Sequence, residues 1–125
     1  MTINVVDYGA IGDGQTLNTD AIHAAIEECS SRGGGTVAVP AGRFVSGSLF
    51  LRDDITLHLE AGAVLLGSED AADYPVIHTR WEGADQPAHA PLITGRGLRN
   101  VAVTGRGTID GRGGVWWEKH RRKTL

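Results

Sequence analysis

Two adjacent carboxylates, Asp53 and Asp54, come closest in residue type and spacing to acid–base chemistry in this sequence. Paired carboxyl groups can act as general acid and general base when both face one substrate. These two follow Leu51 and precede an alternating run that begins at Ile55, so they fall between two predicted strands. Aspartate is favoured in turns because its side chain bonds to the nearby backbone, and neighbouring residues on a turn point apart. We therefore interpret the pair as a structural turn and assign it no catalytic role.

The sequence predicts no metal site and no cofactor. Its histidines are scattered, without the spacing that places two imidazoles on one helix face: His23, His58, His78, His89 and His120. Cys29 is the single cysteine, which excludes an internal disulfide and a cysteine-based zinc site. Glycine-rich stretches at 9–17 and 105–111 lack the order of a phosphate-binding loop, so we interpret them as turns.

Three tryptophans, Trp81, Trp116 and Trp117, are candidates for stacking against the apolar face of a sugar ring. Aromatic faces suit this contact for the same electrostatic reason that they attract cations. The alternative is that they pack loops onto the body of the protein. The sequence leaves both interpretations open, so the substrate-binding residues stay unassigned.

Charge and hydropathy exclude some classes of partner. The formal net charge is −3, which gives no support for binding to nucleic-acid phosphates. The basic run at 119–123 is typical of a solvated segment. No stretch approaches the ~20 apolar residues of a membrane span, and the start lacks the basic and apolar regions of a signal peptide. We expect no nucleic-acid partner and no membrane partner, and localisation stays open between cytoplasmic and secreted.

A helix is predicted at about 19–32. Asn18 or Thr19 can cap its start, and four apolar residues follow with helical spacing on one face: Ile22, Ala25, Ile26 and Cys29. The glycines at 33–35 end it. Residues 7–18, before this helix, are turn-rich.

After the helix the apolar period changes to two, as in strands, with coils predicted at about 36–66 and 91–111. His58 alternates with Leu57 and Leu59, so we expect it to point outward. Glycine is frequent, at 18 of 125 residues, and hairpin dipeptides between clean strands are missing. Such a pattern is typical of an all-β parallel β-helix, with the helix capping its N-terminal end before the first coil. Residues 68–91 interrupt the pattern and are predicted to be a loop excursion.

Several stretches carry a family resemblance. Residues 4–10 (NVVDYGA), 12–14 (GDG) and 18–22 (NTDAI) resemble the opening of the pectin-lyase-like β-helix superfamily. More selective are 34–42 (GGTVAVPAG), 56–63 (TLHLEAGA), 73–75 (DYP) and 105–111 (GRGTIDG) with the tryptophans at 116 and 117. Together they are similar to the N-terminal part of polygalacturonases of glycoside hydrolase family 28. This resemblance implies a right-handed parallel β-helix.

The resemblance also implies a function for the parent enzyme, namely inverting hydrolysis of α-1,4-galacturonan, with pectic polysaccharide or oligogalacturonide as its partner. In that family the catalytic machinery lies in later coils, in Asn-Thr-Asp, Asp-Asp, Gly-His-Gly and Arg-Ile-Lys motifs. This chain contains neither Gly-His-Gly nor Arg-Ile-Lys. Its own Asn-Thr-Asp at 18–20 opens the capping helix, and its Asp-Asp at 53–54 lies in an early turn. We therefore interpret residues 1–125 as an N-terminal fragment of one β-helix domain, inactive alone.

Two further interpretations stay open: another enzyme of the superfamily, such as a pectate lyase, and a polysaccharide-binding module of the tail-spike type. For a β-helix that stops after its first coils, the sequence predicts an open end near 101–103 and 108–109. Unpaired strand edges template pairing with another chain, so we expect self-association there unless that end is covered.

Overall fold

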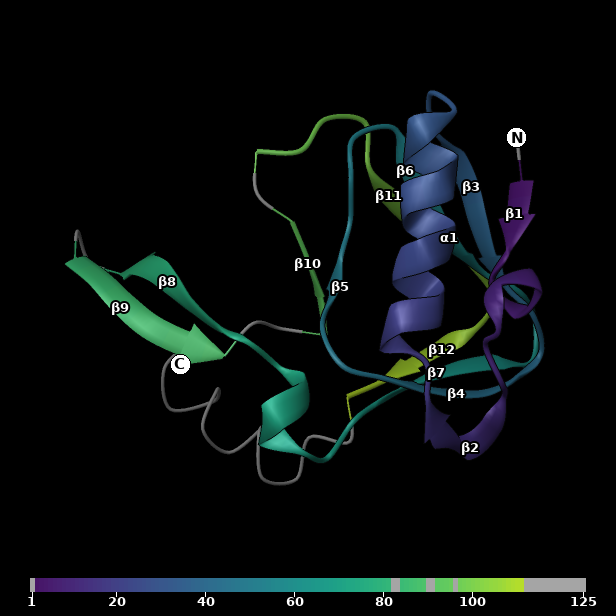
Figure 1. Ribbon diagram of the computed structural model, residues 1–125, viewed down its shortest axis with the longest axis horizontal. Coiled ribbons are helices and arrows are strands. Elements are labelled where there is room, and N and C mark those ends of the chain that lie inside the picture. Colours follow the sequence, from purple (N-terminus) through teal and green to yellow (C-terminus); the bar gives the residue numbers. More distant parts are fainter. Residues whose placement is uncertain (1, 82–83, 90–91, 96, 112–125) are drawn as a thin grey trace.

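The computed structural model describes residues 2–81, 84–89, 92–95 and 97–111. Figure 1 shows short strands winding around a common core, with helix α1 (Thr19–Ser31) lying across them. Short 3-10 helices occur at η1 (Val5–Tyr8) and η2 (Ala71–Asp73). The strands are β1 (Thr2–Asn4), β2 (Asp13–Leu17), β3 (Gly35–Val39), β4 (Gly42–Ser46), β5 (Leu49–Phe50), β6 (Ile55–Leu59), β7 (Ala63–Gly67), β8 (Val76–Trp81), β9 (Ala84–His89), β10 (Ile93–Thr94), β11 (Ala102–Gly105) and β12 (Thr108–Asp110).

The coil strands assemble into parallel sheets. Sheet A contains β1, β3, β6 and β11 in that order, sheet B contains β2, β4, β7 and β12, and sheet C contains β5 and β10. Thr36 pairs with Thr56 one coil later, and Thr56 pairs with Ala102 in the next coil. The chain therefore winds as a parallel β-helix, which confirms the predicted fold class.

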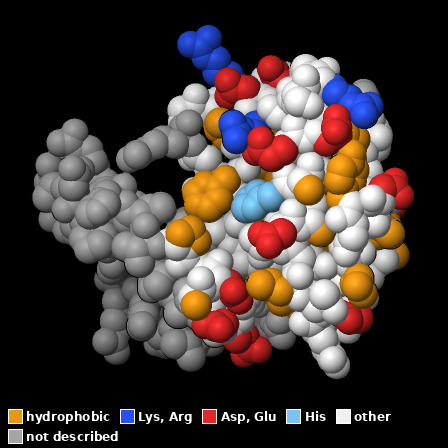
Figure 2. Space-filling view, in the orientation of Figure 1, with side chains coloured by type: hydrophobic (Ala, Val, Ile, Leu, Met, Phe, Trp, Pro, Cys, Tyr) orange, Lys and Arg blue, Asp and Glu red, His pale blue; other side chains and the backbone are white. Residues whose placement is uncertain are grey.

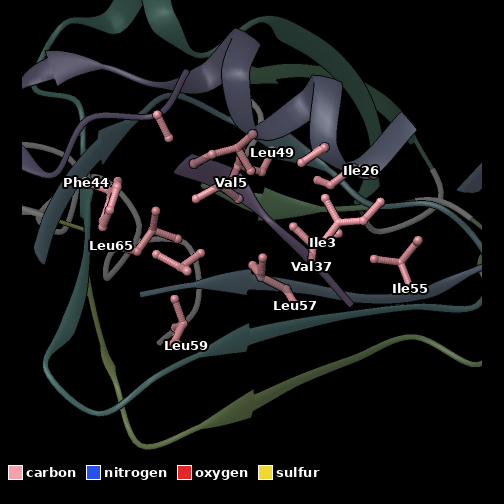
Figure 3. Packing of buried hydrophobic residues seen from close by; sticks show 14 of the residues in the cluster. Ile3, Val5, Ile26, Val37, Phe44, Leu49, Ile55, Leu57, Leu59 and Leu65 are labelled. Atoms are coloured by element: carbon pink, nitrogen blue, oxygen red, sulfur yellow. The ribbon is translucent and has the colours of Figure 1, made fainter. Parts of the chain in front are cut away.

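Inward-facing apolar side chains stack from coil to coil and form the core (Figure 3). In sheet A, Ile3, Val37 and Leu57 occupy one register position on successive strands, and all are buried. In sheet B, Phe44 and Leu65 stack in the same way. Full burial of such a side chain contributes about 1.5–3 kcal/mol. The alternating sequence pattern thus becomes a continuous apolar column along the axis of the coil.

Helix α1 covers one end of this column. Its predicted apolar stripe is completely buried: Ile22, Ala25, Ile26 and Cys29. This face packs against η1, β1, β3 and β5. The predicted helix and its role as an end cap are confirmed.

A glycine pair closes the C-terminal end of α1. The Gly33 N–H donates to the Ser30 carbonyl and the Gly34 N–H to the Cys29 carbonyl, the bonding pattern of a Schellman motif. Both glycines have left-handed φ, +96° and +100°. A Cβ atom on Gly34 would lie 2.5 Å from the Asp54 carbonyl oxygen, so this position requires glycine.

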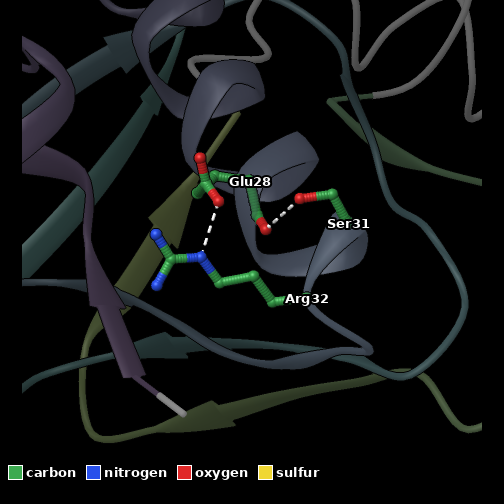
Figure 4. A network of polar contacts seen from close by, with 3 residues as sticks. All are labelled: Glu28, Ser31 and Arg32. Carbon is green, nitrogen blue, oxygen red and sulfur yellow. Dashed lines mark hydrogen bonds and ion pairs between the residues drawn. The ribbon is translucent and has the colours of Figure 1, made fainter.

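Polar side chains follow the last turn of α1 on its solvent side (Figure 4). Arg32 Nε donates to Glu28 Oε2 at 2.6 Å, and Ser31 Oγ donates to the Glu28 carbonyl at 2.8 Å. The ion pair raises the pKa of Arg32. An exposed pair of this kind contributes little to stability, so the buried face, not this network, holds the helix in place.

The first coil begins earlier than the sequence indicates. Strands β1 and β2 pair in parallel with β3 and β4, so residues 2–17 form a partial coil and α1 follows it rather than preceding any coil. The turn-rich residues 13–17 form strand β2 because β4 supplies its backbone partners, which local propensity does not register. Asp13 Oδ1 accepts from the N–H groups of Gln15 and Thr16, chiefly Thr16, which lowers the pKa of Asp13 to about 2.

The excursion at 68–91 contains structure that the sequence analysis did not predict. Strands β8 and β9 form an antiparallel hairpin in which His78 pairs with Pro87. In Figure 1 this hairpin extends away from the three sheets. The prediction of a loop was wrong here because residues 84–89 (ADQPAH) include aspartate and proline, which are depleted in strands. Pairing with β8 overrides that preference.

Candidate functional site

The adjacent carboxylates Asp53 and Asp54 bind backbone and amide groups of the next coil. Asp53 Oδ1 accepts from the Arg99 N–H at 2.8 Å, and Asp54 Oδ1 accepts from Asn100 Nδ2 at 3.1 Å. The Asp54 N–H donates to the Arg99 carbonyl, and the Asp54 carbonyl accepts from the Gly35 N–H. Asp54 and Asn100 share left-handed φ values of 62° and 56°, which these two residue types tolerate. The pair therefore links the turns of three coils.

The Asn-Thr-Asp run at 18–20 is also engaged in structural bonds. Asn18 is buried, and its side chain does not cap the helix. It accepts from the Ile11 N–H at 2.8 Å and donates to the carbonyls of Ile11 and Thr16. Thr19 Oγ1 accepts from the Gly47 N–H at 2.7 Å. These side chains tie the first coil and the start of α1 to the bend after β4.

A third polar group holds the root of the β8–β9 hairpin. The Asp73 carboxylate accepts from the Ser68 hydroxyl, and the Tyr74 hydroxyl donates to the Ser68 carbonyl at 2.7 Å. The Asp73 carbonyl accepts from the Ser48 N–H in the bend one coil earlier. Strand β8 begins at Val76, so these bonds fix the point where the hairpin leaves the coil. The Asp-Tyr-Pro stretch at 73–75 thus has a positioning role.

Two histidines have defined surroundings. His58 lies between buried Leu57 and Leu59 and points outward as predicted, with Nδ1 2.9 Å from Thr104 Oγ1. His23, on α1, accepts a hydrogen bond at Nε2 from the Phe50 N–H at 2.9 Å. Partial burial lowers the pKa of His23. No sequence signal pointed to the His23 contact because the two residues are far apart in the chain.

The other candidate residues fall beyond what the structure describes. Among the described residues, no group of three or more His, Cys, Asp or Glu could hold a metal ion. Within the same ranges, no helix has the length and apolar character needed to cross a membrane. Figure 2 shows acidic and basic side chains interspersed over one face, without a large area of one sign. Outside the description lie the side chains of Trp81, His78 and His89, and all of Trp116, Trp117, His120 and the basic run at 119–123.

Solved structures share this architecture. A family 28 exopolygalacturonase from Yersinia enterocolitica matches with a TM-score of 0.83 and 44% identity, over 89% of this chain and 21% of that one. An exopolygalacturonase from Thermotoga maritima matches with a TM-score of 0.82 and 38% identity, over 89% of this chain and 25% of that one. These neighbours confirm the right-handed β-helix and the resemblance to glycoside hydrolase family 28.

Curated relatives point the same way. A probable polygalacturonase from Vitis vinifera is 44% identical over 93% of this chain, and an exo-poly-alpha-D-galacturonosidase from Dickeya chrysanthemi is 43% identical over 89%. This chain spans only 26% and 19% of their lengths. The family model described as rhamnogalacturonase A/epimerase, pectate lyase-like matches residues 2–125. The chain therefore belongs to the rhamnogalacturonase A/epimerase, pectate lyase-like family.

Proposed function

We propose that this chain is the N-terminal part of a polygalacturonase-like glycoside hydrolase that cleaves α-1,4-galacturonan with inversion. The observation that carries the proposal is the joint match in sequence and fold to the Yersinia exopolygalacturonase. Because the chain spans about a fifth of that structure, the activity belongs to the whole enzyme. The described residues supply its capped first coils, and the partner of the whole enzyme is a pectic polysaccharide or oligogalacturonide.

We propose no catalytic role for any residue of the described part. An inverting glycosidase needs two carboxyl groups that face one glycosidic bond and leave room for a water molecule. Asp53 and Asp54 instead bind the turn at 99–100, and Asp20 lies exposed in the first turn of α1. These bonds support a framework role for Asp53 and Asp54, and the position of Asp20 in the first turn of α1 is one where a negative charge favours the helix.

A reducing-sugar assay on polygalacturonate tests the proposal. The 125-residue chain alone should release no reducing ends, whereas the longer gene product that contains it should release them. Activity of the chain alone that disappears in Asp53→Asn or Asp20→Asn would show that these carboxylates are catalytic.

A second candidate is an enzyme or a binding module of a related class. An alginate lyase from Azotobacter vinelandii is 56% identical, but over only 38% of this chain. A surface adhesin of Streptococcus pneumoniae shares the fold over 53% of this chain with a TM-score of 0.50. Unsaturated products from the longer gene product would indicate a lyase, and polysaccharide binding without turnover would indicate a binding module.

A further inference from the structure

One backbone donor of sheet C faces away from the rest of that sheet. The N–H groups of Leu49 and Leu51 donate to the carbonyls of Leu92 and Thr94 in the next coil, at 2.6 and 2.9 Å. Phe50 lies between them on β5, so its N–H points to the opposite edge. On that side the first coil contributes α1 where later coils contribute a strand. Among the described strands, none therefore offers a carbonyl to the Phe50 N–H.

The imidazole of His23 takes the place of that missing carbonyl. Its Nε2 accepts from the Phe50 N–H at 2.9 Å, and the two rings lie 6.1 Å apart at an angle of 35°. A ring nitrogen that accepts carries no proton, so the imidazole is neutral and its proton is on Nδ1. The contact thus requires one protonation state and one tautomer.

Charged groups from both packed elements surround this ring. Asp20 and Glu27, on α1, favour the protonated form, and Arg52, which follows β5, opposes it. Arg52 Nη2 also lies 2.8 Å from Glu27 Oε1, which offsets part of the attraction of that carboxylate for the imidazole. Partial burial is the largest influence, and it lowers the pKa of His23 below the ordinary value of 6.5.

We propose that His23 is an acid-sensitive cap on the edge of sheet C. When a solvent proton binds the lone pair of Nε2, that nitrogen becomes a donor and faces the Phe50 N–H, which then loses its acceptor on α1. The junction between α1 and β5 loosens, and the edge of β5 becomes available for other pairing. As the pH falls, the unfolded chain takes up this proton before the folded chain does. The free energy of unfolding therefore begins to decrease near pH 6.5 and continues to decrease until His23 is protonated in the folded chain.

Amide hydrogen exchange of the 125-residue chain, normalised to intrinsic exchange rates, tests this directly. Between about pH 7.5 and about pH 5, the protection of the Phe50 amide should fall about tenfold. The amides of Leu49 and Leu51 donate to carbonyls, which do not titrate, so their protection should change little. Equal losses at all three amides, or no loss at Phe50, would overturn the proposal.

Two variants separate the cap from general effects of acid. In His23→Gln the side-chain oxygen can accept from the Phe50 N–H at any pH, so the loss of protection should disappear. In His58→Gln the loss of protection at the Phe50 amide should persist, because His58 contacts Thr104 and not the Phe50 N–H. If His23→Gln does not fold, imidazole ¹⁵N spectra of the wild-type chain decide the matter. A neutral ring protonated at Nε2 would contradict the proposal.

Discussion

The two ends of the coil carry the same inward pattern but differ in what covers it. At the α1 end, Ile3 is 8% exposed, and Ile26 and Val37 are completely buried. At the other end, Val103 and Ile109 continue the register of Leu57 and Leu65, yet they are 43% and 46% exposed. An inward position therefore guarantees burial only when another element lies over it.

The end covered by α1, here called the closed end, also shows which functions of a strand a helix can replace. A helix face covers apolar side chains, but its backbone groups are used internally, so it does not continue the hydrogen-bond ladder of a sheet. Side chains near the start of α1 complete the bonding instead. Asn18 accepts from the Ile11 N–H, Thr19 from the Gly47 N–H, and His23 from the Phe50 N–H.

The largest expected difference between the ends concerns apolar truncation. Ile26→Ala at the closed end should lower the free energy of unfolding by about 2–5 kcal/mol, because it leaves a cavity under the helix. Ile109→Ala at the open end should lower it by about 1 kcal/mol or less, because the side chain is already half exposed. Urea denaturation of both variants measures the difference. Equal losses would mean that Ile109 is buried in solution.

A smaller effect should follow from removing a side-chain acceptor at the closed end. Thr19→Val keeps the shape of the side chain but leaves the N–H of buried Gly47 without its side-chain partner, which should cost about 1–3 kcal/mol. Thr19→Ser retains the hydroxyl and is the matched control. The same denaturation experiment applies, and a variant Thr19→Val as stable as Thr19→Ser would show that water replaces the bond.

The open end should also produce weak self-association of the isolated chain. Val103 and Ile109 are exposed, and β11 and β12 are the last described strands of sheets A and B, so this end offers apolar surface and strand edges to another chain. In sedimentation velocity, the average sedimentation coefficient should rise over about a hundredfold range of concentration.

Charge substitutions locate that association. Ile109→Lys should suppress it, whereas Ile11→Lys, at an exposed apolar residue before β2, should not. A wild-type chain that stays monomeric throughout would show that the open end is already covered.

Local pattern was sufficient for the elements whose spacing is regular. The stripe from Ile22 to Cys29 predicted α1 and its buried face, and the alternation at Leu57, His58 and Leu59 predicted which side chains point inward. The local sequence pattern did not predict strands whose pairing partner is distant in the sequence. Strand β2 and strand β9 contain aspartate, glycine or proline, and they are strands because β4 and β8 pair with them.

Asp53 and Asp54 show the same limit at the candidate site. Their residue type indicated a turn, which is where they lie, but their partners Arg99 and Asn100 come from the next coil. His23 was one of five scattered histidines in the sequence, and the return of the chain at Phe50 gave it a specific role.

The sequence by itself determined the family, the parallel coil, the capping helix and the inward face of each main strand. The family follows from the resemblance of motifs such as residues 34–42 and 56–63. The coil, the helix and the inward faces follow from periodicity and turn residues, which act over a few neighbours. Tertiary structure alone decided that residues 2–17 form a coil, that the excursion is a hairpin, and that side chains of α1 complete the open edges of the first bends. Those outcomes depend on which backbone groups still need a hydrogen-bond partner once the coils have formed. Every residue type except proline has the same backbone N–H, so the sequence near a donor does not indicate which distant group will accept from it.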